Sequence, residues 1–144
     1  MATDTILVTI RDVGNHQALL EAVLDVAEPT DATVVLAKAY SEEEYEQRVD
    51  ELDFEGQPKT DQVAQRNETV RDAETVLREA AIEYEVRGVV GEEGDALVEL
   101  AKTIDADLMY IQGKGRTPTG KALFGSTAQT ILLNAPCPVT YVRG

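Results

Sequence analysis

Five short runs of apolar, largely β-branched residues alternate with segments of helical periodicity, and this alternation restricts the fold more than any other feature. Because the runs are apolar at nearly every position, each predicts a strand buried on both faces. They cover residues 5–10, 33–39, 84–90, 107–111 and 139–142. Strands that alternate with helices form a parallel sheet covered on both faces, and right-handed crossovers make it an open, doubly wound α/β sheet. A length of 144 residues predicts one domain spanning 1–144.

The helices are predicted from apolar periodicity and from their end signals. They cover residues 16–27, 41–52, 60–82, 94–104 and 126–135. The segment Pro29-Thr30-Asp31 is expected to break the first helix, and His16 at its start is expected to be solvent-exposed. Ser41 with Glu44, and Ser126 with Gln129, each match a capping box. The segment 41–61 stays open between helix and loop.

A glycine-rich loop follows the fourth predicted strand. Residues 113–125 contain four glycines, and the loop leads into a helix whose first residues, Ser126 and Thr127, carry hydroxyls. Glycines let backbone N–H groups approach a ligand, and a helix N-terminus adds free N–H donors. No acidic residue follows Asp107, whereas four basic ones do: Lys114, Arg116, Lys121 and Arg143. The loop therefore predicts an anion or phosphate cradle, and a purely structural glycine turn is the alternative.

The position of a ligand crevice depends on the strand order. In a doubly wound sheet, ligands bind beyond the carboxyl ends of the strands, where the order reverses. If the first and fourth strands are neighbours, the segments 11–15 and 112–125 form that crevice.

The chain is strongly acidic, with 27 Asp and Glu against 13 Lys and Arg and a formal net charge of −14. This charge argues against nucleic acid and anionic membranes as partners. It also fits a halophilic cytoplasm, where the Debye length of about 3 Å at molar salt screens the repulsion. No apolar run is long enough to span a membrane, and the N-terminus lacks the pattern of a signal peptide. We therefore expect a cytoplasmic protein from a halophilic, archaeal source.

The sequence shows no catalytic or metal-binding constellation. The run from Gly115 to Lys121 nearly matches a P-loop, but Ala122 stands where a Mg²⁺-binding hydroxyl is required. One cysteine and one histidine give no zinc spacing. The acidic runs 42–44 and 92–93 are interpreted as solvated faces. We therefore predict no catalytic residues and no metal site.

Several segments resemble the universal stress protein family over nearly the whole chain. The residues that carry the resemblance are Ile6-Leu-Val8, Ala106 to Ile111, Gly115-Arg-Thr117, Gly125-Ser126 and Asn134 to Val139. The resemblance implies a five-stranded parallel sheet of order 3-2-1-4-5. It also implies a homodimer formed by the last strands, here Val139–Val142, and an edge strand favours such pairing in any case.

The family resemblance also implies a site for ATP or AMP, with Mg²⁺ accompanying ATP, at the loop 112–127. The residues placed in it by position are Arg11, Asp12, Val90, Gly113, Lys114, Gly115, Arg116, Gly125, Ser126 and Thr127, with Val89 and Gly91 beside Val90. Gln112 stands at the first motif glycine, and Arg11 stands where the family has an aspartate near adenine.

Two main hypotheses follow: a dimeric stress-response protein that binds adenine nucleotide, or a nucleotide-free dimeric interaction module with a degenerate site. Slow ATP hydrolysis rests on analogy alone. A regulatory protein partner is not identified by the sequence.

Overall fold

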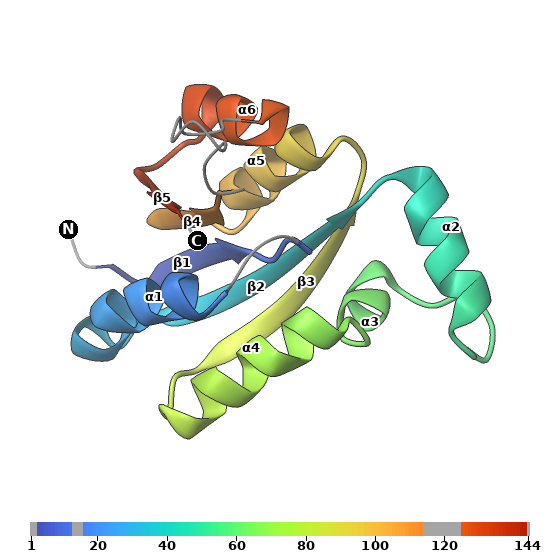
Figure 1. Cartoon of the computed structure of the whole chain (residues 1–144), viewed down its shortest axis with the longest axis horizontal. Helices are drawn as coiled ribbons and strands as arrows, with labels where there is room; N and C mark the ends of the chain where they lie inside the picture. Colours follow the sequence, from blue (N-terminus) through green and yellow to red (C-terminus); the bar gives the residue numbers. More distant parts are fainter. Residues whose placement is uncertain (1–2, 13–15, 114–124, 144) are drawn as a thin grey trace, which may run out of the picture.

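The computed structural model describes residues 3–12, 16–113 and 125–143. These residues form one parallel sheet with helices on both faces (Figure 1). The strand order is β3-β2-β1-β4-β5, and every neighbouring pair is parallel. The strands are β1 (Thr5–Thr9), β2 (Thr33–Tyr40), β3 (Tyr84–Val90), β4 (Leu108–Gln112) and β5 (Val139–Val142). The predicted fold class and the strand order 3-2-1-4-5 are confirmed.

Helices cover the sheet in two layers. Figure 1 shows α5 and α6 on one face, and α1, α3 and α4 on the other. The helices are α1 (Gln17–Thr30), α2 (Glu42–Glu51), α3 (Thr60–Ala64), α4 (Glu68–Glu79), α5 (Glu93–Thr103) and α6 (Ser126–Asn134). None of these helices is both long and apolar enough to cross a membrane.

Successive side chains along each strand point to opposite faces of the sheet, and this divides the hydrophobic core into two clusters. On β1, Ile6 and Val8 face the layer of α1 and α4, whereas Leu7 faces α5 and α6. All three side chains are fully buried. Both faces of the central strands are therefore apolar, as their continuous hydrophobic sequence requires.

The first helix ends within the segment Pro29-Thr30-Asp31 that was expected to break it. α1 extends to Thr30, with Pro29 inside its last turn. The Thr30 hydroxyl donates to the carbonyl of Val26 at 2.6 Å. The C-cap is Asp31, which has a left-handed backbone (φ 56°). The predicted break is therefore confirmed, although the helix extends to Thr30 instead of residue 27.

The long helix predicted over 60–82 is two helices, α3 and α4. Asn67 interrupts it, because its side chain accepts a hydrogen bond from the backbone N–H of Val70 at 3.0 Å and caps α4. The break lets α3 lie against the edge strand β3, where the N–H of Gly88 donates to Asp61 Oδ1 at 2.7 Å. A Cβ at Gly88 would collide with the backbone of Thr60, so only glycine permits this contact.

The two predicted capping boxes have different outcomes. At α2 the box is present, since Ser41 and Glu44 bond reciprocally at 3.1 Å. This result also resolves 42–51 as helix. At α6 the prediction was wrong: the helix begins at Ser126 and its N-cap is Gly125, which provides no side-chain hydrogen bond.

Candidate functional site

The first and fourth strands are neighbours, so the condition for a crevice between their loops is fulfilled. β1 pairs with β4 on one side and with β2 on the other, and the strand order therefore reverses at β1. The described residues beyond these strand ends are Arg11, Asp12 and Gly113. They lie where ligands bind in sheets of this kind.

Arg11 is a nearly buried cation on the α5 side of the crevice. Its Nε and Nη2 atoms each donate to the Glu93 carboxylate at 3.3 Å, and Nη1 donates to the carbonyl of Gln112 at 3.3 Å. The side chains of Arg11 and Glu93 are 11% and 31% exposed. The sequence-based interpretation of Glu93 as part of a solvated face was therefore wrong.

Lys38 is the second nearly buried cation, on the α1 side of the crevice. Its ammonium lies 3.0 Å from Asp12 Oδ2 and 5.6 Å from the ring centroid of Tyr40. Its side chain is 8% exposed, whereas that of Asp12 is 52% exposed. Burial raises the pKa of Asp12, but the hydrogen bond and the charge of Lys38, assisted by Asn67 and Thr69, outweigh burial and lower the pKa overall.

The end of β4 is tightly packed. Gln112 is completely buried, and its Oε1 atom has no hydrogen-bond partner among the residues that the structure describes. The N–H of Gly113 donates to the carbonyl of Val142 at 2.7 Å. A Cβ at Gly113 would collide with the ring of Tyr141. Packing against β5 therefore requires a glycine at position 113, whether or not a ligand also approaches its backbone.

The start of α6 meets the start of α5 at a small cavity of about 140 Å³. The Thr127 hydroxyl donates to Glu93 Oε1 at 2.7 Å, so Glu93 links Arg11 to the first turn of α6. The two helices approach closely because Gly94 has no side chain, and a Cβ there would lie 2.7 Å from Cβ of Thr130. Glu93, Thr127 and Arg11 thus form one connected cluster.

The remaining candidate residues are placed less closely together. Val90 is exposed at the end of β3, and with Val89 and Gly91 it lines a hollow against α5 in which neither Arg11 nor Asp12 takes part. The structure therefore connects Arg11 with Thr127 through Glu93, and places Asp12 with Lys38 in a separate cluster. Three residues of the predicted cationic loop, Lys114, Gly115 and Arg116, are not among those that the structure describes.

Two cavities share the lining residue Thr69, and Asp12 lines the first of them. One, of about 360 Å³, is lined by Tyr40, Val63 and Asn67 among others. Burial raises the pKa of Tyr40 to about 12. The space is larger than one flat aromatic base needs, and it has both polar and apolar walls.

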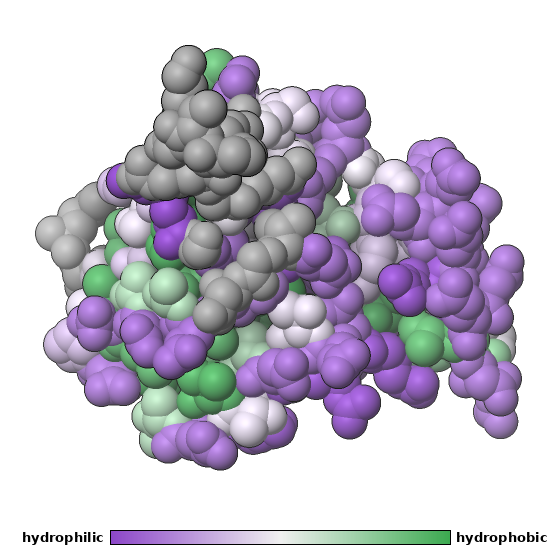
Figure 2. Space-filling view, viewed as in Figure 1, coloured by the Kyte–Doolittle hydropathy of each residue, from purple (hydrophilic) through white to green (hydrophobic). Residues whose placement is uncertain are grey.

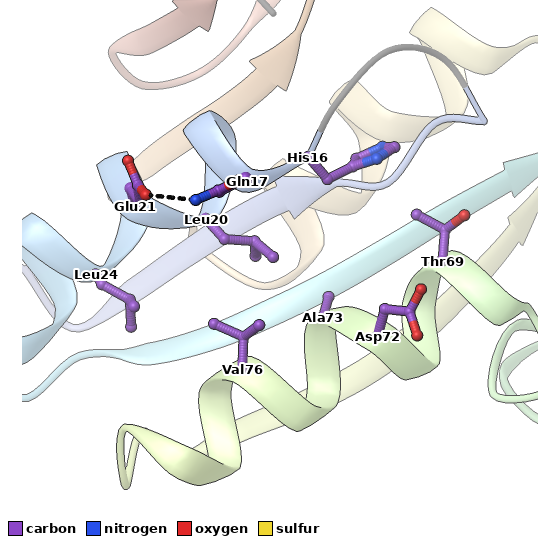
Figure 3. Close-up of a pocket in the computed structure, with 9 residues that line it drawn as sticks. All are labelled: His16, Gln17, Leu20, Glu21, Leu24, Thr69, Asp72, Ala73 and Val76. Atoms are coloured by element: carbon purple, nitrogen blue, oxygen red, sulfur yellow. Dashed lines mark hydrogen bonds between the residues drawn. The ribbon is translucent and has the colours of Figure 1, made fainter.

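The other cavity is a groove of about 520 Å³ between α1 and α4. Figure 3 shows Leu20 and Leu24 facing Ala73 and Val76 across it. The groove coincides with a hydrophobic stretch between the two helices (Figure 2).

The groove is linked to the crevice at one end through two lining residues. Thr69 Oγ1 lies 3.5 Å from Asp12 Oδ1, and His16 Nε2 lies 2.6 Å from the carbonyl oxygen of Arg11. His16 is half-buried and not solvent-exposed as predicted, because of this bond.

Two residues of the site, Lys38 and Glu93, were missed by sequence reasoning. A single lysine inside the otherwise apolar strand 33–40 was the available signal for Lys38, since a buried lysine requires a partner. Glu93 had no comparable signal, because acidic residues are frequent at helix starts for electrostatic reasons alone.

The arrangement has the chemistry of a binding site. Arg11, Lys38 and the hydroxyl of Thr127 suit the recognition of an anion. No group of three or more His, Cys, Asp and Glu side chains in the described parts of the chain is arranged to hold a metal ion.

Comparisons with known proteins agree with the sequence resemblance. The model of the universal stress protein family matches residues 2–143. A universal stress protein of Mycolicibacterium smegmatis is 37% identical over 79 residues, which are 54% of this chain and 61% of that protein. The match thus covers less than two thirds of that relative's length.

Solved structures show the same fold. A universal stress protein in complex with cAMP has a TM-score of 0.69 and 25% identity, with 99% of this chain and 98% of that chain covered. A universal stress protein of Archaeoglobus fulgidus in complex with dAMP has a TM-score of 0.67 and 22% identity, with 98% of each chain covered. Since the family model spans nearly all residues, the chain belongs to the universal stress protein family.

Proposed function

We propose that this universal stress protein binds an adenine nucleotide in the cytoplasm, in the crevice beyond β1 and β4. The base is placed toward Asp12 and Tyr40, and the phosphate toward Arg11 and the start of α6. The observation that carries the proposal is the pair of nearly buried cations, Arg11 and Lys38, at the carboxyl ends of adjacent strands. On an acidic protein, two such cations at the switch point of the sheet favour an anionic ligand.

Relatives support the choice of adenine nucleotides, since solved members of the family hold cAMP and dAMP. The loop 112–125 contains neither a histidine nor an acidic residue that could act as a general base or bind a metal ion, and binding without turnover is therefore expected. ATP with Mg²⁺ remains the larger candidate ligand and AMP the smaller.

Calorimetric titration with AMP and Mg-ATP at molar KCl tests the proposal, with sulfate as the control anion. A micromolar dissociation constant, about −8 kcal/mol, is expected for at least one nucleotide. Arg11→Gln should weaken it about tenfold, whereas Arg78→Gln, on the exposed side of α4, should leave it unchanged. Folded protein that gives no heat with millimolar nucleotide contradicts the proposal.

A second candidate is a nucleotide-free dimeric interaction module. It is favoured by the fact that both crevice cations already have carboxylate partners. Leu132 and Leu133 of α6 are exposed beside β5, which is an edge strand able to pair with a second copy.

Sedimentation equilibrium with Thr140→Glu tests the dimer. Thr140 is exposed on β5, and a new carboxylate there would face its own copy near the twofold axis. The dimer dissociation constant should rise at least about tenfold, while Thr75→Glu on α4 should not change it. A wild-type protein that stays monomeric rules this candidate out.

A further inference from the structure

The cavity at the starts of α5 and α6 combines hydroxyl groups with an unusual number of carboxylates. Its lining residues are Glu92, Glu93, Gly94, Asp95, Ser126, Thr127 and Thr130. Three of them are acidic, and none of them is basic. A phosphate group that reaches the first turn of α6 therefore approaches several negative charges at once.

Glu93 occupies the best anion-binding position of this cavity. Its Oε1 atom accepts from the Thr127 hydroxyl at 2.7 Å and lies 3.3 Å from Arg11 Nη2, and Oε2 accepts from Arg11 Nε at 3.3 Å. A hydroxyl and a guanidinium are the groups that an incoming phosphate needs. The carboxylate thus stands where part of a phosphate would bind.

The first turn of α6 gives this position an additional attraction for anions. Its N-cap Gly125 makes no side-chain hydrogen bond, so the first N–H groups of the helix have no cap of that kind. The helix start therefore favours negative charge, and the carboxylate of Glu93 contacts this first turn through the Thr127 hydroxyl.

We propose that Glu93 acts as a charge filter that selects nucleotides with a single phosphate, such as AMP or a cyclic monophosphate, over di- and triphosphates. The inference rests on the proposed nucleotide binding and specifies its ligand class. A single phosphate group can bind Arg11 while Glu93 stays bound to it, or it can replace one of the two hydrogen bonds between Arg11 and Glu93. Each further phosphate adds negative charge near Glu93, Glu92 and Asp95, and affinity falls on the order of tenfold for each added charge at low ionic strength.

The test is a series of titrations with cAMP, AMP, ADP and ATP in EDTA. EDTA keeps the nucleotides free of Mg²⁺, so that their negative charge rises along the series. The KCl concentration is the lowest at which the protein remains folded, because molar salt screens the repulsion. The measured quantity is the ratio of the AMP and ATP affinities.

Glu93→Gln keeps an acceptor for Thr127 and removes the charge. It should raise ATP affinity at least about tenfold and leave AMP affinity within about threefold. Glu92→Gln is the matched control, because it removes the same charge from an exposed residue of the same cavity. It should change the ratio by less than about threefold. The filter would also be supported if ATP bound to the Glu93→Gln variant but not to the wild-type protein.

Other outcomes overturn the inference in distinguishable ways. If wild-type protein binds AMP, but the ratio is the same in wild type and Glu93→Gln, the filter is wrong and the proposed function stands. If folded wild-type and variant proteins bind no nucleotide, both are wrong.

Discussion

Two ion pairs at neighbouring strand ends, Arg11 with Glu93 and Lys38 with Asp12, look alike and are held differently. Both cations are nearly buried, with 11% and 8% of their side chains exposed. The Arg11 guanidinium donates to a carboxylate and to the carbonyl of Gln112, whereas the Lys38 ammonium donates to Asp12 alone among the described residues. A guanidinium has five fixed donors and an ammonium is a compact charge, so the loss of the acid leaves the two cations in different situations.

The comparison also shows that two consecutive residues just after β1 direct their side chains to opposite sides of the sheet. Arg11 and Asp12 are consecutive, yet Arg11 pairs with α5 on one side of the sheet and Asp12 with Lys38 on the other. An Arg and an Asp that could have neutralised each other are instead each matched with a partner distant in sequence. The crevice therefore has two separate charge clusters, one on each side of β1.

The largest effect is expected for Asp12→Ala. Without Asp12, Lys38 is left as a nearly buried unpaired charge, and the free energy of unfolding should fall by about 2 kcal/mol. Urea unfolding at molar KCl measures it. Glu93→Ala is the comparison variant, and its loss should be smaller because Arg11 keeps the carbonyl of Gln112. Equal losses in the two variants would mean that the two pairs are equivalent.

A smaller effect is expected where α4 supports the Asp12 cluster. Asn67→Ala removes the cap bond to Val70, and the free energy of unfolding should fall by about 1 kcal/mol. Asn67→Ser keeps a side-chain acceptor at the N-cap without adding a charge beside Asp12, and serves as the control. Thermal unfolding of both variants checks this, and an Asn67→Ser variant as unstable as Asn67→Ala would contradict the assignment of a cap.

Glu93→Gln should have only a slight effect on stability, about 0.5 kcal/mol. The variant keeps the acceptor for Thr127, and the pair it weakens is partly exposed. This small loss matters because it allows binding to be compared between folded proteins. Urea unfolding at several KCl concentrations measures it, and a loss larger than that of Asp12→Ala would reverse the proposed order of the two clusters.

The smallest change per step is expected for the pH dependence of the stability that the pair of Lys38 and Asp12 contributes. Because the pKa of Asp12 is lowered in the folded protein, the pair stabilises the fold above the unfolded pKa of about 3.9, and this stability is lost as the pH falls through the folded pKa. The difference in unfolding free energy between wild type and Asp12→Asn should therefore be constant near neutral pH and disappear in acid. A difference that persists at the lowest pH would exclude Asp12 as its source.

The sequence predicted more of the fold than of the site, because strands depend on local patterns and the site depends on distant contacts. Strand positions follow from continuous apolar runs, and the predicted boundaries of 84–90 and 139–142 are those observed. Helix ends depend on single side chains, and here Asn67 divided the segment that the periodic pattern predicted as one helix. The partners of Lys38 and Glu93 lie on segments distant in sequence, so that a lone lysine in an apolar strand signals a buried charge without naming its partner, and Glu93 has no local signal at all.

The contact between Gly88 and Asp61 has a consequence for how copies of the chain can add to one another. It occupies a backbone donor on the outer side of β3 and places α3 against that edge. Among the described residues, the β3 edge is therefore partly covered, and β5 is the edge at which a second copy could pair. If two copies join there by antiparallel pairing, both ends of the combined sheet are covered β3 strands, and growth stops at a closed pair instead of a filament.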